Sequence, residues 1–171
     1  MKNIKNKNGF TLVELLAVIV VLAIVMGIAA VAMTNILDNM RKNTFVADAE
    51  QFIEGAKSLV AADEVEIMLG GTPTHAPKCA ATGNETTFPI SDIKTEGMDD
   101  DKSPYGLNFN KTASKIKVTA TPITAGDYTE CKYTYAIYLT DDVYAIEGST
   151  AGSFVNETDL SSTYVNPKKS S

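Results

Sequence analysis

The chain has 171 residues and a formal net charge of −6 at pH 7, with 21 acidic and 15 basic side chains. This length allows one small globular domain beside a membrane anchor. Surfaces that bind nucleic acid are normally basic, so the acidic balance argues against nucleic acid as a partner.

A long apolar segment lies near the N-terminus. The sequence has no charged side chain between Leu15 and Met33, and about 20 apolar residues are enough for a helix to cross a bilayer. Three lysines and no acidic residue precede this segment, and such a basic flank tends to stay in the cytoplasm. The sequence therefore predicts one membrane-spanning helix at residues 10–33, with the N-terminus inside and the rest of the chain outside.

A single carboxylate, Glu14, stands at the head of this segment, within Gly9-Phe10-Thr11-Leu12-Val13-Glu14. A charged side chain costs about 2.5–3.5 kcal/mol at the centre of a bilayer, so its presence requires a reason. A secretory signal peptide cut after Ala30-Val31-Ala32 does not supply one, because such a signal has an apolar core of only about 7–15 residues. A simple anchored domain with Glu14 at the membrane interface explains the span but not the Gly9-Phe10 pair.

The short basic leader, Gly9 before Phe10, the Thr11-Leu12-Val13-Glu14 sequence and the apolar helix together resemble a type IV prepilin. The resemblance covers roughly residues 1–60. It implies that a dedicated membrane peptidase removes the leader, residues 1–9, by cutting between Gly9 and Phe10. Phe10 then becomes the N-methylated first residue and Glu14 the fifth. The nine-residue leader and the terminal Phe are more similar to the type IVa subclass than to the type IVb subclass.

The resemblance also implies roles in assembly. Our hypothesis is that Glu14 sets the register between subunits by capturing the α-amino group of Phe10 from another subunit. The membrane helix of this family commonly has a proline in its second half, where this chain has Val31. The nearest helix-weakening residue is Gly27, so we predict that any stretch that loosens in a filament lies between Gly27 and Ala30.

Beyond Met33 the apolar residues recur at spacings of three and four, which predicts an amphipathic helix that continues the membrane helix. The helix is expected to run to Leu69, because Gly70-Gly71-Thr72-Pro73 is a strong stop signal. Residues 10–69 would then form one long helix whose second half packs on a sheet. The apolar positions are Ile36, Leu37, Met40, Phe45, Ala49, Phe52, Ile53, Ala56, Leu59 and Val60.

The remaining residues, 70–171, are expected to form a globular head. A long loop is predicted at 70–114, with at most a short strand near Phe88 or Phe109. Antiparallel strands are predicted between about 115 and 160, where residues 133–139 and 143–146 should pair as a hairpin. The polar segment after Ser161 is expected to be a partly disordered tail.

The two cysteines, Cys79 and Cys131, both lie beyond the membrane span. In an oxidising compartment they would most simply form one disulfide. The alternative is two free, buried thiols. In many members of the resembling family a disulfide closes a C-terminal loop, and Cys131 lies too far from the C-terminus to match that pattern.

No catalytic constellation is evident in the sequence. His75 is the only histidine and is expected to be exposed in a loop, and His75 with Cys79 would be an incomplete metal set. Residues 99–101 are three aspartates that could hold calcium, but they lack the alternating spacing of a calcium loop. The neighbouring Ser103-Pro104-Tyr105-Gly106 is similar to a loop of the pseudopilins.

The sequence thus predicts an α+β pilin, a non-enzymatic structural subunit without a cofactor. It would wait in the cytoplasmic membrane among lipids and then assemble as a homo-oligomeric helical filament, a surface fimbrium for adhesion or twitching motility. Its partners would be the prepilin peptidase and the pilus assembly machinery. A minor pilin, a type II secretion pseudopilin and a DNA-binding competence pilus subunit remain alternatives. An anchored enzyme or sensor would need a site that the sequence does not reveal.

Overall fold

A computed structural model describes residues 11–80, 84–93, 102–124 and 127–169. The chain divides into two compact units, residues 1–39 and residues 40–171, which we call unit 1 and unit 2. One helix, α1, spans Leu12–Met68 and contributes to both units. Unit 2 also contains an antiparallel sheet, so the chain is an α+β protein, as the sequence predicts.

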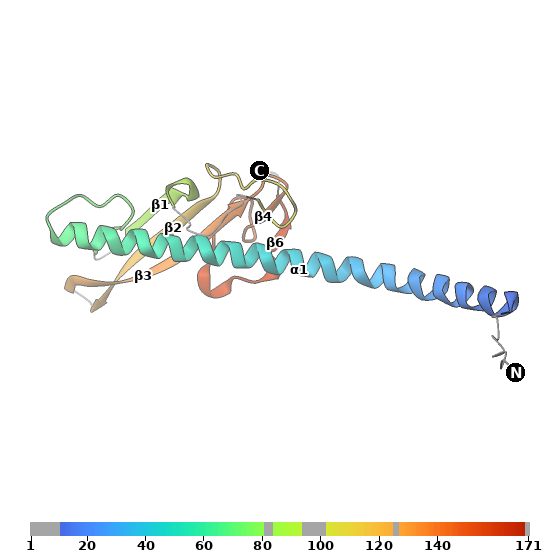
Figure 1. Cartoon of the computed structure of the whole chain (residues 1–171). Coiled ribbons are helices and arrows are strands. Elements are labelled where there is room, and N and C mark those ends of the chain that lie inside the picture. The colour runs from blue at the N-terminus through green and yellow to red at the C-terminus, as the bar shows by residue number, and fades with distance from the viewer. Residues whose placement is uncertain (1–10, 81–83, 94–101, 125–126, 170–171) are drawn as a thin grey trace, which may run out of the picture. The chain divides into compact units, whose positions relative to one another are not determined.

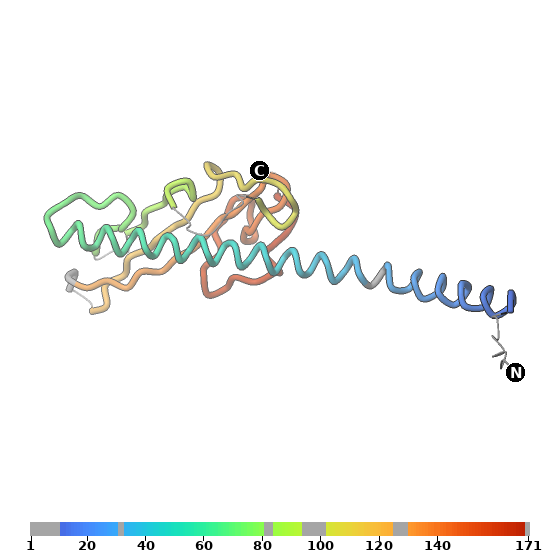
Figure 2. The backbone as a smooth tube through the Cα atoms, viewed as in Figure 1, coloured from blue at the N-terminus to red at the C-terminus, as the bar shows by residue number. Residues whose placement is uncertain are grey.

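The end of α1 is set by two glycines. Gly70 has a φ of +82°, a left-handed conformation that glycine adopts without steric cost. Its N–H donates to the carbonyl of Ile67, and the N–H of Gly71 donates to the carbonyl of Glu66. This pair of hydrogen bonds is a Schellman motif, which satisfies carbonyls left open at a helix end. The predicted stop at Gly70-Gly71 therefore has a structural cause, and the backbone then turns back toward the sheet (Figure 2).

The sheet has six antiparallel strands in the order β1-β2-β3-β4-β6, and β5 also pairs with β3. The strands are β1 (Asn84–Pro89), β2 (Lys115–Thr124), β3 (Asp127–Thr140), β4 (Tyr144–Ile146), β5 (Val155–Asn156) and β6 (Val165–Pro167). Within the described residues, three short 3-10 helices lie between the strands: η1 (Ile90–Asp92), η2 (Glu157–Asp159) and η3 (Ser162–Tyr164). The predicted hairpin is present as β3 and β4, where Leu139 pairs with Ile146.

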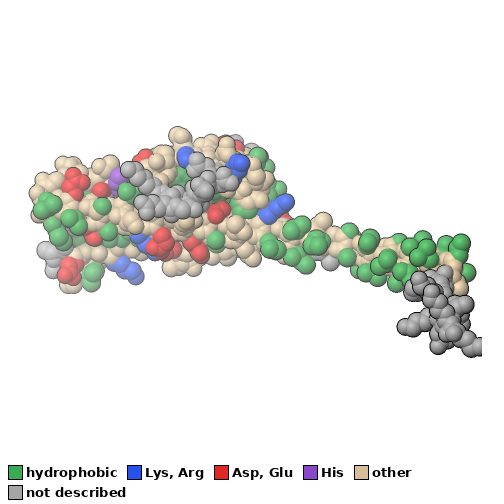
Figure 3. Space-filling view, in the orientation of Figure 1, with side chains coloured by type: hydrophobic (Ala, Val, Ile, Leu, Met, Phe, Trp, Pro, Cys, Tyr) green, Lys and Arg blue, Asp and Glu red, His purple; other side chains and the backbone are tan. Residues whose placement is uncertain are grey.

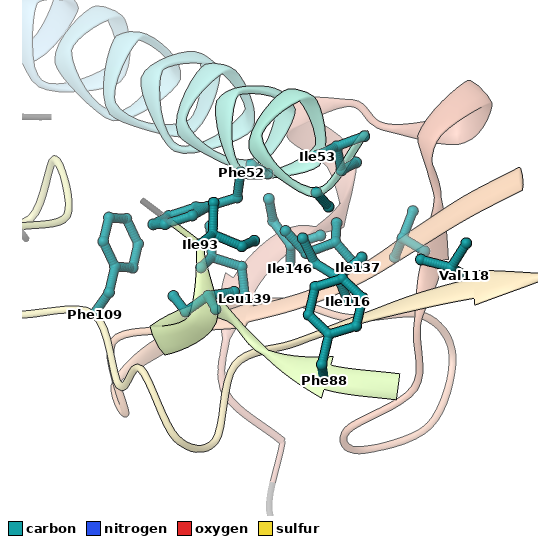
Figure 4. Close-up of a cluster of buried hydrophobic side chains, with 14 of the residues drawn as sticks. Phe52, Ile53, Phe88, Ile93, Phe109, Ile116, Val118, Ile137, Leu139 and Ile146 are labelled. Atoms are coloured by element: carbon teal, nitrogen blue, oxygen red, sulfur yellow. The ribbon is translucent and has the colours of Figure 1, made fainter. Parts of the chain in front are cut away.

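The core of unit 2 lies between α1 and one face of the sheet (Figures 1 and 4). The side chains alternate along β2, so that Ile116, Val118 and Ala120 are fully buried. The helix contributes its apolar stripe, as the spacing predicts, with Phe45, Ala49, Phe52, Ile53, Ala56 and Val60 all buried. Figure 4 shows Phe52 and Ile53 of α1 facing the strand residues Ile116, Ile137 and Ile146.

The region between α1 and β2 contributes more than a loop. Strand β1 contains Phe88 and pairs with β2 along its whole length. Phe109 is in no strand, but its ring packs edge-on against the rings of Phe45 and Phe52, at centroid distances of 5.3 and 5.8 Å. The first of the two expected strand positions is therefore a strand, and the second is a core anchor from a loop.

The prediction of a partly disordered tail after Ser161 is wrong for the residues that the structure describes. Strand β6 pairs with β4, with Val165 opposite Ile146, and Val165 is fully buried. The backbone N–H of Lys169 donates to the carboxylate of Glu147, which is itself buried. The C-terminal segment thus supplies the strand at one edge of the sheet.

Candidate assembly site

The start of α1 is organised by Thr11 and Glu14. The backbone N–H and the hydroxyl of Thr11 both donate to one carboxylate oxygen of Glu14, each at 2.9 Å. In return, the backbone N–H of Glu14 donates to the Thr11 hydroxyl at 3.3 Å. This reciprocal arrangement is a capping box, which satisfies N–H groups that have no partner inside the helix. Gly9 and Phe10, the predicted processing residues, lie outside the described residues.

The capping box was not part of the sequence interpretation, although its signal is present. Thr11-Leu12-Val13-Glu14 has the Thr-x-x-Glu spacing of a capping box before an apolar run. The spacing would have placed the first helical residue at Leu12, where α1 begins. Glu14 is therefore a helix-capping residue within its own subunit, in addition to any role between subunits.

The part of α1 in unit 1 presents exposed apolar side chains along its length, and Figure 3 shows those on the face in view. Among the described residues, α1 is the one helix that is long and apolar enough to cross a membrane. Such a surface is stable in lipid or against other apolar helices. Between Leu12 and Met33 the large apolar side chains of the described residues are 49–81% exposed: Leu12, Val13, Leu15, Leu16, Val18, Ile19, Val20, Val21, Leu22, Ile24, Val25, Met26, Ile28 and Met33.

Gly27, the predicted helix-loosening residue, lies within continuous α-helix. A Cβ atom added at this position would have no heavy atom within 4 Å, so no close packing requires a glycine here. Continuous helix is the expected state of a single subunit, because intrahelical hydrogen bonds satisfy its backbone in an apolar environment. Loosening near Gly27 on assembly remains a prediction.

The structure joins Cys79 and Cys131 in a disulfide, with a Cα–Cα distance of 5.8 Å and a sequence separation of 52. Cys79 lies in the segment after α1, and Cys131 lies in β3. The bridge therefore ties the returning segment to the sheet. The bridge also occupies Cys79, which removes it as a metal ligand.

We expect that replacing both cysteines with alanine lowers the free energy of unfolding by about 4 kcal/mol, because the bridge restricts a loop of this length in the unfolded chain. The measurement is denaturant unfolding of the full-length protein in detergent. Thiol titration of the unfolded, unreduced protein is the control, and it should find no reactive thiol. Two reactive thiols per wild-type chain would show that the bridge does not form.

His75 lies in the segment after α1, but its side chain is not exposed, contrary to the prediction. Its side chain is only 17% exposed, and its ring packs edge-on against Phe88 at a centroid distance of 4.9 Å. Its Nδ1 lies 3.5 Å from the carboxylate of Asp63, and its Nε2 lies 3.9 Å from that of Asp92. The histidine thus helps to hold the segment after α1 against the helix and the sheet.

The Asp63 side chain holds the same segment by accepting hydrogen bonds from the backbone of that segment. One of its carboxylate oxygens accepts hydrogen bonds from the N–H groups of Thr74, His75 and Ala76, at 2.9, 2.5 and 2.9 Å. Burial acts to raise the pKa of Asp63, but these three donors together hold the pKa below its ordinary value. Asp63 is therefore a structural anion near the end of α1, and no local pattern in the sequence indicates this role.

A second carboxylate on α1, Asp48, is half-buried, and burial raises its pKa to about 6. Between about pH 4 and pH 6 the folded chain then binds more protons than the unfolded chain, whose aspartates titrate near pH 3.9. The contribution of Asp48 to the free energy of unfolding should consequently fall as the pH rises from about 4 to about 6. We expect Asp48→Asn to raise the melting temperature at pH 7.5 and to have a much smaller effect at pH 4.5.

The measurement is thermal unfolding of the full-length protein at both pH values. The matched control is Glu50→Gln, which neutralises an exposed carboxylate two positions further along the same helix. An Asp48→Asn effect that is the same at both pH values would show that burial of this charge does not affect stability.

Within the described residues, no group of three His, Cys, Asp or Glu side chains is arranged to hold a metal ion. The three aspartates at 99–101 lie outside the described residues. The neighbouring Ser103 is buried, and its hydroxyl donates to Asp141 at 2.5 Å. Tyr105 stacks on Tyr144 with a centroid distance of 3.7 Å. The loop that is similar to a pseudopilin loop therefore packs on the β3–β4 hairpin.

A family model described as the prokaryotic N-terminal methylation motif matches residues 4–30. No curated protein and no solved structure matches the chain. The matched range contains the residues predicted for processing together with Glu14 and most of the exposed apolar helix. This motif is the signal of type IV prepilins, and it supports a type IV pilin-like protein.

Proposed function

We propose that this chain is the structural subunit of a type IV pilus filament. The observation that supports the proposal is the exposed apolar helix between Leu12 and Met33, which follows directly on the methylation motif. Before assembly this surface would be covered by lipid in the cytoplasmic membrane. After extraction it would be covered by the same helices of other copies, so that it stays in an apolar environment throughout.

The prepilin peptidase would cut between Gly9 and Phe10 and methylate the new N-terminus. The leader and the helix would be oriented with the N-terminus inside, and unit 2 would lie outside the membrane. An assembly machine would then transfer each subunit into a filament that serves in surface adhesion or motility. The chain itself would carry out no catalysis, since its family motif points to a structural subunit.

The experiment is electron microscopy of surface filaments from cells with the chain, without it, and with the chain restored from a plasmid. We expect filaments to disappear on deletion and to return on restoration. The amount of the chain in sheared filaments separates a major subunit, which dominates the protein content, from a minor pilin or a secretion pseudopilin. Unchanged filament number and composition without the chain would contradict the proposal.

A further inference from the structure

Unit 2 has an apolar groove at the end where α1 stops. The groove has a volume of about 700 Å³ and is lined by Ile67 and Met68 of α1, Ile123 of β2, Tyr133 of β3 and the Cys79–Cys131 bridge. Ile67, Met68 and Ile123 are 42%, 85% and 64% exposed. Figure 3 shows hydrophobic side chains gathered at this end of unit 2, with acidic and basic side chains beside them.

The exposed apolar surface of unit 2 is concentrated around this groove. Among its described residues, eight large hydrophobic side chains are exposed, and five of them belong to this end of the unit. The five are Val65, Ile67, Met68, Leu69 and Ile123. An apolar patch with a polar rim is typical of a surface that binds another protein.

The rim of the groove is mainly acidic. Glu64 and Glu130 line it beside one lysine, Lys78, and Glu66 lies between Val65 and Ile67. Burial, and next the nearby Glu64 carboxylate, raise the pKa of the Tyr133 hydroxyl, so this carboxylate lies close to the groove's tyrosine. An occupant should therefore combine an apolar side chain with a positive charge.

A second copy of this chain offers an apolar side chain next to a positive charge where α1 enters unit 2, at the opposite end of that part of the helix from the groove. Met40 is 59% exposed and precedes Arg41 and Lys42. The Arg41 guanidinium lies 5.9 Å from the ring centroid of Tyr105, so its position is defined. Lys57 is the next basic residue of α1, but it is already paired with Glu54 and Glu157, at 2.8 and 2.6 Å.

We propose that the groove at the end of α1 binds the Met40–Arg41 segment of a second copy, which joins the copies head to tail. The proposal rests on the filament function proposed above and specifies a register for it. Glu64 lies 23 positions after Arg41, which corresponds to about 35 Å along a helix. Two different surfaces meet in this contact, so it repeats without closing, as an open helical filament requires.

The apolar contacts would supply most of the free energy, and the charges would select the register. Charged groups at the rim of an interface contribute little to affinity but disfavour wrong partners and wrong alignments. A copy shifted along its neighbour would place Arg41 away from the carboxylates and would leave Met68 in water. The filament would consequently show subunit contacts offset by about 35–42 Å along the helix axis, which are the spans from Arg41 to Glu64 and from Met40 to Met68 at the same rise per residue.

The test is cysteine crosslinking in filaments of the full chain that carries Met40→Cys and Met68→Cys together. The two positions lie about 42 Å apart on one helix, so their sulfurs can form a bond only between copies. We expect mild oxidation to produce a ladder of dimers, trimers and longer oligomers. The controls are each single variant, which should give no ladder, and Met40→Cys with Val143→Cys, whose second cysteine is exposed on the β3–β4 turn.

Charge reversal tests the register within the same background. We expect Glu64→Lys to reduce the ladder severalfold and the addition of Arg41→Glu to restore it. Filaments that form normally but show no ladder, or that crosslink equally through Val143→Cys, would overturn the proposed contact between copies. They would leave the filament function standing. Cells in which the wild-type chain produces no filament would overturn the filament function and this contact with it.

Discussion

Glu14→Ala is expected to abolish most filament assembly while leaving membrane insertion and cleavage after Gly9 intact. In an apolar filament core, the positive α-amino group of Phe10 would lose its partner, and an unpaired buried charge costs about 3–5 kcal/mol. We expect at least about a tenfold loss of filaments, since 1.4 kcal/mol already corresponds to a factor of ten. The measurement is the yield of sheared filaments beside a processing assay by intact mass.

The capping box makes the matched control essential. Glu14→Gln retains an oxygen that can accept the N–H of Thr11, because capping boxes accept Glu or Gln at this position, but it removes the charge. If pairing with the Phe10 amine drives assembly, Glu14→Gln should fail as Glu14→Ala does. Wild-type filament yield from Glu14→Gln would show that Glu14 acts through the helix cap alone.

Gly9→Leu is expected to block removal of the leader and, with it, filament formation. The resembling family is cut after a small residue beside the membrane, and a large side chain at that position should not fit the peptidase. The uncut leader would keep three lysines at the end of the apolar helix. Placing these charges in a filament core without partners is prohibitively costly.

Intact-mass analysis of the membrane fraction measures this effect. Gly9→Ala is the matched control, because its side chain is still small, and it should be processed. Efficient cleavage of Gly9→Leu would contradict the assignment of the processing site. A mature protein that begins near Met33 would favour the secretory signal peptide instead.

The features that the sequence predicted are those with local signals. The long helix follows from uninterrupted apolar residues and a stripe at helical spacing, and its end follows from Gly70, whose φ of +82° suits the Schellman motif. Strands β2, β3 and β4 follow from alternation and a short turn. In each case the residues that determine the structure are close together in sequence.

The features that the sequence did not predict depend on distant partners. Strand β6 has only three residues, and its pairing with β4 supplies what its own sequence lacks. Phe109 is buried because two rings of α1 cover it. The burial of His75 follows from Phe88 and Asp63, neither of which its neighbours in sequence reveal.

The same distinction applies to the candidate assembly site. The processing residues and Glu14 were selected by a short motif, and the family model covers that motif. The groove at the end of α1 brings together residues from Glu64 to Tyr133, and no spacing in the sequence indicates that they meet. Such a groove can be recognised only from the three-dimensional arrangement of the helix end, the disulfide and the β2–β3 pair.

The most direct test of the filament account is the intact mass of the protein in sheared surface filaments. We expect this chain to be a constituent of the filaments, to span residues 10–171, to carry one methyl group on the amine of Phe10, and to have Cys79 and Cys131 bridged. A chain that is absent from the filaments, or that remains in the membrane fraction with its leader uncut, would contradict the account.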